Sequence, residues 1–361
     1  MPTTVNDFRA KAVTSALAPL FIRMNYIADQ AIQEESRLER GERLEIAGLG
    51  SIQVGASGSV DVVAQSVAAD SLDLFVDLDP MINIEVKIKE REQNLRGNWD
   101  NNLAQQATTR LRNYIDSEIA DYLARVVAFD TGTEATHHYN VNGAKLTSEP
   151  ILAAQAAIES NDGYGGRSAM FAHPFGKANI MAIPEFVPNH TQAEQGNLGI
   201  PLLGSIYGMP VYTSQSVLRD QAAISNQWAV SGGTLTVTLA ATGHGFVPGQ
   251  LVTFDTVTAG GDLATATAIT SVTDTTVTIE SSGLSNGGAS EAGTLRGQTA
   301  LNLIVDLDHY HVAMQRRPEV RFVNRENRSS DNMQVTGLYG RVARTGRVKV
   351  LHTAAASVPT S

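Results

Sequence analysis

The sequence contains no cysteine, few aromatic residues and no long hydrophobic run, and each absence removes a class of protein. Without cysteine there can be no disulfide framework, thiol nucleophile or thiolate metal site. Aromatic residues make up only 6% of the chain while 31 residues are glycine, which favours turns and extended segments over an aromatic-lined pocket. The start, MPTTVNDFRAKAV, lacks the apolar core of a secretory signal, and no apolar run could cross a bilayer. We therefore expect a soluble chain made in a cytoplasm, with no membrane partner.

Positive charge is also scarce, and it is unevenly distributed. The formal net charge of -10 argues against a protein whose main task is to bind nucleic acid. Between Val230 and Leu295 there is no Lys or Arg at all. Residues 311–350, in contrast, contain nine Lys and Arg against three acidic residues, a local net charge of +6. This asymmetry requires an explanation, and a basic surface for a partner is one.

Two stretches of the sequence have the pattern of a phosphotransfer site. LDLFVDLDP at 72–80 and LNLIVDLDHYH at 301–311 both end in Asp-x-Asp, which can present two carboxylates to Mg²⁺. After Asp77 and Asp79 come proline and methionine, where such enzymes have a small hydroxyl residue, and Asp306 and Asp308 have only about fifty residues after them. We interpret both pairs as ordinary strand ends.

Two histidines beside the second pair could form a metal site. His309 and His311 are two residues apart, so on a strand both would point to the same face. No third ligand stands at a recognisable spacing, and the sequence has no phosphate-binding loop, serine-hydrolase elbow, zinc-protease or dinucleotide-binding motif. We therefore predict no catalytic residue, no metal, no cofactor and no enzymatic activity.

The periodicity of apolar residues predicts alternating helical and extended regions. Residues 8–44 have helical spacings followed by a charged run, whereas 48–63 and 82–90 alternate and are interpreted as the two sides of one long β-hairpin. The strongest signal is a long amphipathic helix at about 95–128. A shorter helix follows, with Pro150 near its start.

The second half of the chain is predicted to be mainly extended. SAMFAHP and IPLLGSIYGMPVYTSQSV suggest strands, with a turn at Gly-Met-Pro. From Val230 to Leu295, alternating runs such as TLTVTL, LVTFDTV and TVTIES are separated by glycine-rich breaks, which predicts a small all-β unit set into another domain. After this unit the composition returns to that of the preceding domain, and the apolar stretch LNLIVDL predicts a strand.

Four stretches carry a resemblance to a known family: GNWDNNLAQQATTRLRNYIDSEIADYLARVV, GIPLLGSIYGMPVYTSQSV, GHGFVPGQLVTF and RFVNRENRSSDNMQVTGLYGRV. With the order of the elements, they resemble the major capsid (coat) protein of tailed bacteriophages, the Hong Kong 97 fold, and within it most of all the P22-like coat proteins. It implies an α+β fold with the following parts: an N-terminal arm (1–45), an extended β-hairpin loop (46–93), a spine helix and peripheral domain (94–149), an axial domain (150–228), an inserted all-β domain (229–297) and strands returning to the axial and peripheral domains (298–361).

The same resemblance implies a structural function. A protein of this family self-assembles into the icosahedral capsid that encloses phage genomic DNA, and it is found in the virion after assembly in the bacterial host cytoplasm. The implied partners are copies of the chain in hexamers and pentamers, scaffolding and portal proteins, and DNA by non-specific proximity only. Three alternatives rank below it: an encapsulin-type shell for protein cargo, a non-catalytic tail component or adhesin, and the Mg²⁺ phosphotransfer enzyme.

The residues themselves also suggest contacts between copies. A lone β-hairpin as long as 46–92 is marginal in water and needs another surface to cover it. The acidic hairpin stem and the basic C-terminal segment could meet across subunits, where charge would set register and orientation; the alternative that both are solvated faces remains open. The hypothesis names these residues for inter-subunit contact: Asp70, Asp73, Asp77, Asp79, Arg316, Arg317, Arg321, Arg341 and Arg344.

Overall fold

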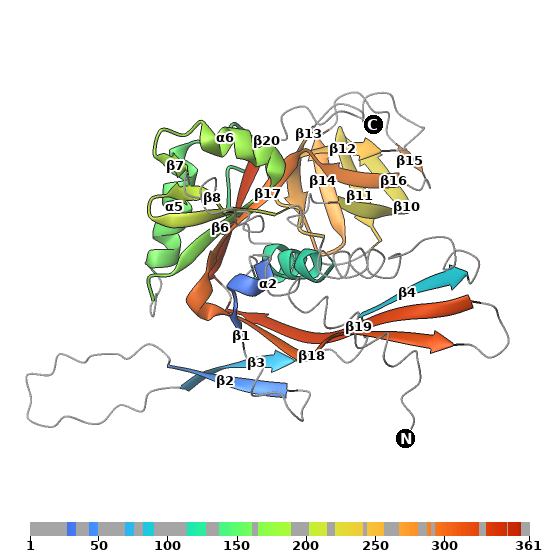
Figure 1. The fold of residues 1–361 in the computed structure, drawn as a ribbon. Coiled ribbons are helices and arrows are strands. Elements are labelled where there is room, and N and C mark those ends of the chain that lie inside the picture. Colours follow the sequence, from blue (N-terminus) through green and yellow to red (C-terminus); the bar gives the residue numbers. More distant parts are fainter. Residues whose placement is uncertain are drawn as a thin grey trace, which may run out of the picture. The chain divides into compact units, whose positions relative to one another are not determined.

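The computed structural model describes fifteen segments of the chain, which hold all the elements discussed below (Figure 1). They are residues 27–33, 43–49, 69–75, 82–89, 114–127, 137–160, 165–188, 202–214, 221–240, 244–255, 267–280, 287–289, 293–324, 330–344 and 346–354. These segments divide into two compact units, one formed by residues 1–115 and 310–343 and the other by residues 116–309 and 344–361. The chain therefore passes between the units three times.

The first unit contains a four-stranded sheet built from distant parts of the chain. Its strand order is β1-β18-β19-β4, with bounds β1 (Ile32–Gln33), β18 (Tyr310–Asn324), β19 (Ser330–Ala343) and β4 (Ile82–Lys89). A short helix, α2 (Ile27–Gln30), precedes β1. Strands β18 and β19 form a long antiparallel pair, and β4 pairs antiparallel with β19.

A separate two-stranded hairpin belongs to the same unit. Strand β2 (Arg43–Leu49) pairs antiparallel with β3 (Ala69–Phe75). The first side of the predicted long hairpin, 48–63, lies almost entirely outside the described residues, so that pairing stays a prediction; Ile82–Lys89 is bonded to β19. Alternation identifies a strand without identifying its partner, since any neighbour with the same pleat can complete it.

The second unit is built on a seven-stranded mixed sheet, called the central sheet here. Its order is β5-β20-β17-β6-β9-β8-β7. The bounds are β5 (His138–Tyr139), β6 (Ser168–Ala172), β7 (Phe186–Pro188), β8 (Leu202–Ile206), β9 (Met209–Thr213), β17 (Thr299–Asp306) and β20 (Val348–Ala354). Every residue of β17 is buried, so this strand lies in the interior of the unit.

Short helices flank the central sheet (Figure 1). Helix α5 (Ser148–Glu159) places Ile151, Ala154 and Ile158 at helical spacing in the apolar core of the sheet, and it confirms the helix predicted around Pro150. The others are η2 (Pro174–Gly176), α6 (Lys177–Met181) and η4 (Leu307–His309). The described part of the predicted long helix is helical at 114–122 and ends in a π-helical turn, η1 (Leu123–Val127); its N-terminal part lies outside the described residues.

A turn in the central sheet corrects one detail of the sequence interpretation. Strands β8 and β9 are joined by Tyr207 and Gly208, which have φ angles of 50° and 78°. Positive φ at both positions is typical of the two-residue hairpin turns whose twist matches the strands. The turn thus precedes the predicted Gly-Met-Pro step by one residue, and Met209 already belongs to β9.

Between β9 and β17 the chain forms a second sheet, closed on itself. Its order is β11-β14-β13-β12-β16-β10-β15, and an additional β10–β11 pairing closes six of the strands into what we call the β-barrel. The bounds are β10 (Gln221–Ser231), β11 (Thr234–Leu239), β12 (Leu251–Asp255), β13 (Thr267–Val272), β14 (Thr276–Glu280), β15 (Gly287–Ala289) and β16 (Gly293–Gly297). The strands extend over Gln221–Gly297, a little beyond the 229–297 expected for the insertion; that they form an independent domain stays a prediction.

The interior of the β-barrel follows from the two-residue repeat of its sequence. In β11 the apolar residues Leu235, Val237 and Leu239 are buried, whereas the threonines between them are only half-buried. Successive side chains of a strand point to opposite faces. In TLTVTL the leucines and the valine therefore point into the barrel, and the threonines point outward.

Candidate functional site

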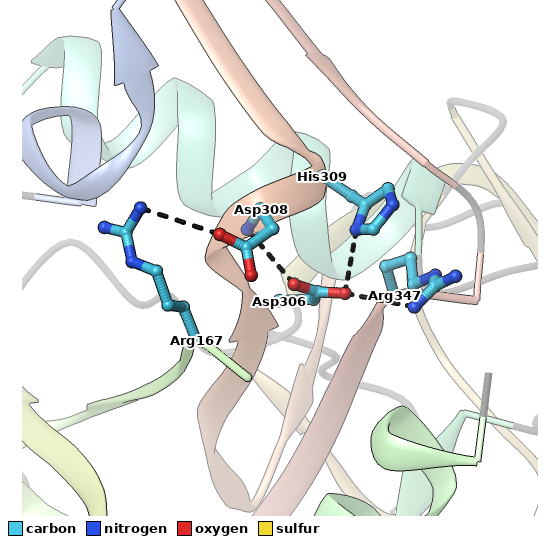
Figure 2. Close-up of polar contacts among 5 residues, drawn as sticks. All are labelled: Arg167, Asp306, Asp308, His309 and Arg347. Atoms are coloured by element: carbon cyan, nitrogen blue, oxygen red, sulfur yellow. Dashed lines mark hydrogen bonds and ion pairs between the residues drawn. The ribbon is translucent and has the colours of Figure 1, made fainter. Parts of the chain in front are cut away.

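The aspartates of LNLIVDLDHYH take part in a cluster of charged groups at the end of β17 (Figure 2). The Asp306 side chain is fully buried, and its Oδ2 accepts a hydrogen bond from Arg347 Nη1 at 3.1 Å. The same oxygen lies 2.9 Å from His309 Nδ1. Oδ1 accepts the backbone N–H of Asp308 at 3.1 Å. The carboxylate is therefore held by three groups from two chain segments.

Asp308 occupies a more open position in the same cluster. One of its oxygens lies 3.6 Å from Arg167 Nη1, in a pair whose arginine is largely exposed. The other, Oδ2, is buried without a hydrogen-bond partner among the described residues. Gly165 permits this arrangement, because a Cβ at that position would lie within van der Waals overlap of the Asp308 carboxyl group.

This geometry does not support the metal or phosphotransfer interpretations of the sequence. His309 lies in the 3₁₀ turn η4 and His311 in β18, so the prediction that both occupy one strand with a common face was wrong. The turn redirects His309 onto Asp306 instead. Within the described part of the chain, no group of three or more His, Asp or Glu residues could hold a metal ion.

The cluster has a structural position that the sequence did not reveal. It lies where the chain leaves the second unit, after His309, and returns to it, at Arg344. The backbone N–H of Arg344 donates to the carbonyl of His309 at 3.2 Å, so the outgoing and returning segments are hydrogen-bonded to each other at that point. Arg347, buried on the returning segment, then binds Asp306 on the outgoing one. The arrangement holds two chain segments together.

The residues predicted for contact between copies are distributed over several elements. Asp70 and Asp73 lie in β3, Arg316, Arg317 and Arg321 in β18, and Arg341 near the end of β19. Arg344 follows β19 and belongs to the second unit. Arg341 and Arg344 already take part in interactions within the chain. Asp77 and Asp79 lie outside the described residues.

The backbone register of the β2–β3 hairpin places Glu45 directly opposite Asp73 and Ala47 opposite Ser71. The intervening positions pair Ile46 with Leu72 and Leu44 with Leu74. A two-stranded hairpin of this length is marginally stable by itself in water.

Sequence reasoning missed two buried basic residues, one just before β20 and one within it. Arg347 and Lys349 were counted among the exposed positive charges of the C-terminal segment, whereas their exposed fractions are both 4%. Lys349 Nζ lies 2.6 Å from His137 Nδ1. The available signal was their context, since Arg347 and Lys349 alternate with Val348, Val350 and Leu351 in an apolar run typical of a buried strand.

Membrane insertion through a helix has no support in the described segments, where no helix is both long enough and apolar enough to span a bilayer.

Comparison with known proteins gives a match of fold and none of sequence. No protein-family model and no curated protein sequence matches this chain. The capsid of Ralstonia phage GP4 has a similar structure, with a TM-score of 0.52 and 11% identity over 92% of this chain and 88% of that chain. Mycobacterium phage Che8 gives a TM-score of 0.49 at 14% identity (90% and 89%), and the capsid of cyanophage P-SCSP1u gives 0.48 at 10% identity (92% and 89%).

The similarity to the Ralstonia phage GP4 capsid shows a shared fold along almost the whole of both chains. The expected capsid-type architecture with mixed α and β content is confirmed at this level. The closer relation to P22-like coat proteins stays a prediction.

Proposed function

We propose that this chain is a structural subunit that assembles with copies of itself into an icosahedral capsid enclosing phage DNA. The observation that carries the proposal is the fold shared with the Ralstonia phage GP4 capsid along 92% of this chain. A cluster whose charges hold two chain segments together agrees with a structural function.

The hairpin and the four-stranded sheet are the proposed surfaces of assembly. The hairpin pairs Ile46 with Leu72 and Leu44 with Leu74, and a two-stranded ribbon of this kind needs a further surface, which a neighbouring copy would supply. The acidic residues Asp70, Asp73, Asp77 and Asp79 would then face basic residues of that neighbour, of which Arg316, Arg317, Arg321, Arg341 and Arg344 are the candidates. Charge at such a contact sets orientation and the rate of encounter more than affinity.

Assembly of this kind depends on many modest contacts. Each added subunit of a closed shell completes several interfaces at once, so individually weak patches act together. In this proposal the copies form hexamers and pentamers in the host cytoplasm, with scaffolding and portal proteins as further partners, and the mature location is the virion. The net charge of -10 lets packaged DNA lie close without strong adhesion.

Electron microscopy and sedimentation velocity of the expressed full chain test the proposal. Closed shells of uniform size, in exchange with capsomer-sized species as concentration rises, are the expected result. A compact monomer at every concentration, with the backbone amides of β2 and β3 protected from hydrogen exchange, would contradict it, because the hairpin would then be covered by its own chain.

A protein-cargo shell is the alternative outcome of the same experiment. It is distinguished by the genes beside the coding sequence and by the contents of the particles. Packaging genes and nuclease-protected DNA support the phage capsid, whereas an adjacent enzyme gene and co-purifying enzyme support the cargo shell.

A further inference from the structure

The β-barrel and the central sheet have separate apolar cores. Residues such as Leu235, Val252 and Leu295 form one buried cluster inside the barrel. Residues such as Met170, Ile304 and Leu351 form another between the central sheet and its helices. Apolar packing is non-directional, so two separate cores leave the orientation of one relative to the other to the groups that lie between them.

A buried row of polar side chains lies between these two cores. The barrel loop before β12 contributes Gln250, whose Oε1 accepts the backbone N–H of Val247 at 3.2 Å and whose Nε2 donates to Thr299 Oγ1 at 3.5 Å. Thr299 Oγ1 lies 2.9 Å from His352 Nδ1. His352 Nε2 in turn lies 3.0 Å from His138 Nδ1. The row thus runs from the barrel through β17 and β20 to β5.

The contacts favour one direction for the hydrogen bonds in this row. Thr299 accepts the Gln250 amide proton, so its own hydroxyl proton can be donated to His352 Nδ1. His352 is then protonated at Nε2 and donates to His138 Nδ1. Each contact pairs one buried polar group with the next, and Gln250, Thr299 and His352 are all fully buried. A hydrogen-bonded row of this kind has a preferred geometry, which an apolar contact lacks.

Close backbone approaches surround the row. A Cβ on Gly143 would lie 2.6 Å from Thr299 Cγ2, and one on Gly249 would lie 3.2 Å from Val141 Cγ2. The Gln298 backbone N–H donates to the carbonyl of Leu251 at 2.8 Å, which ties the start of β17 to β12. The loop of residues 140–143, the barrel loop at Gly249 and the start of β17 therefore meet without room for added atoms.

We infer that the Gln250–Thr299–His352–His138 row is a joint that holds the β-barrel in one orientation on the central sheet and that opens when its histidine pair is protonated. A proton added to His138 goes to Nδ1 and leaves two donors facing each other at 3.0 Å, which breaks the link between His352 and His138. A proton added to His352 goes to Nδ1, 2.9 Å from Thr299 Oγ1, and opposes the hydrogen bond that the Thr299 hydroxyl donates there. The other titratable groups beside the pair are His137 and Lys349, which lie 2.6 Å apart and add no attraction for a further positive charge. The inference concerns contacts within one chain and stands independently of assembly.

Spin labels can test the joint, because the chain has no cysteine of its own. Ala153→Cys on α5 and Thr275→Cys on the barrel provide two exposed attachment sites. Pulsed electron resonance would measure the distance distribution between them in the full chain, diluted with excess unlabelled chain so that distances between copies do not contribute. We expect a single narrow distribution in the parent.

The joint is weakened by Thr299→Val together with Gln250→Leu, which remove its polar atoms at nearly constant volume. The expected result is loss of the single narrow peak while the far-ultraviolet circular dichroism is retained. Thr278→Val, on the half-buried outer face of β14, is the matched control and should leave the peak unchanged. A folded double variant with the parent's narrow distribution would overturn the inference.

Acidification supplies a second test that needs no substitution in the joint. Between about pH 7 and pH 4 the labelled parent should lose its narrow peak before it loses its secondary structure. If the peak stays narrow until the circular dichroism signal itself is lost, the joint does not open on protonation and the inference is wrong.

Discussion

Asp306 and Arg347 form a buried ion pair between the strand that leaves the second unit and the segment that returns to it. Arg347 Nη1 lies 3.1 Å from Asp306 Oδ2, and the exposed fractions of the two side chains are 5% and 0%. Removing one partner of such a pair leaves an uncompensated charge in a medium that solvates it poorly.

We expect Asp306→Asn to lower the free energy of unfolding by ~3–5 kcal/mol, because Arg347 would keep its charge without its partner. Chemical denaturation monitored by circular dichroism measures the change. Asp121→Asn is the control: it breaks the half-buried Arg125–Asp121 pair, one turn apart on a helix at 2.8 Å, and helical pairs of this spacing contribute about 0.5 kcal/mol. If the free energy of unfolding fell equally in the two variants, the buried Asp306–Arg347 pair would matter no more to stability than the Arg125–Asp121 pair.

Gly143 provides a test of packing at the barrel joint. Its φ is +67° and a Cβ would meet Thr299 Cγ2 at 2.6 Å, whereas Gly208, at φ +78°, has nothing within 4 Å. Gly143→Ala and Gly208→Ala thus share the backbone strain, and only the first adds a clash. We expect Gly143→Ala to destabilise the protein by about 1–3 kcal/mol more than Gly208→Ala. A comparison of thermal melting curves measures the difference, and matching curves would contradict the close approach.

The stability of the protein should fall in mild acid because of His352. Burial lowers the pKa of this side chain from its ordinary 6.5 to about 3, and burial together with the neighbouring His352 and His137 lowers the pKa of His138. The folded chain therefore binds fewer protons than the unfolded chain between these values, so stability is fully present above pH 6.5 and is lost as the pH falls towards 3. From His352 alone, the free energy of unfolding should fall by about 2 kcal/mol between pH 7 and pH 5.

Urea denaturation across this pH range checks the prediction. His352→Gln keeps a hydrogen-bonding side chain without a titrating ring, so the slope of stability against pH should decrease in that variant. An unchanged slope would assign the acid dependence to other groups.

Charge reversal tests the proposed contact between copies. Asp73→Lys should reduce the yield of assembled particles, since a basic side chain would then face the basic segment of a neighbour at a cost on the order of 1 kcal/mol per contact. Asp274→Lys, at an exposed position of the barrel loop between β13 and β14, changes net charge equally and should leave the yield unchanged. Analytical ultracentrifugation gives the assembled fraction.

A second substitution can identify the partner of Asp73. If Asp73 meets Arg321 of a neighbouring copy, Arg321→Asp should restore assembly in the Asp73→Lys variant and impair it alone. Rescue by Arg316→Asp or Arg317→Asp in its place would shift the contact along β18, and failure of all three would refute the hairpin–β18 contact.

Several elements of the fold could be predicted from local sequence. TLTVTL and TVTIE became β11 and β14 with alternate burial, and EPILAAQAAIE became α5 with its apolar residues in the core. These predictions succeed because the period of a pattern is a property of neighbouring residues, and burial of the apolar half stabilises the element whatever covers it.

Pairing and environment could not be predicted in this way. Ile82–Lys89 alternates strictly, yet its partner is Ser330–Gly337, about 250 residues further along the chain, because a pleated strand accepts any neighbour of matching register. Asp306 was interpreted as a strand end; its burial beside Arg347 and the turn that brings His309 onto it depend on how three segments meet.

The sequence by itself thus determined that stretches such as TLTVTL and TVTIE are strands and that EPILAAQAAIE is a helix, since these follow from composition and period. Only the tertiary structure decided that Asp306 is bound by Arg347, that Lys349 is buried, and that Gln250, Thr299, His352 and His138 form one row. The physical reason is the range of the interactions involved: periodicity acts over a few residues, whereas a buried charge or hydrogen bond is stabilised by whichever group the fold brings within about 3 Å of it.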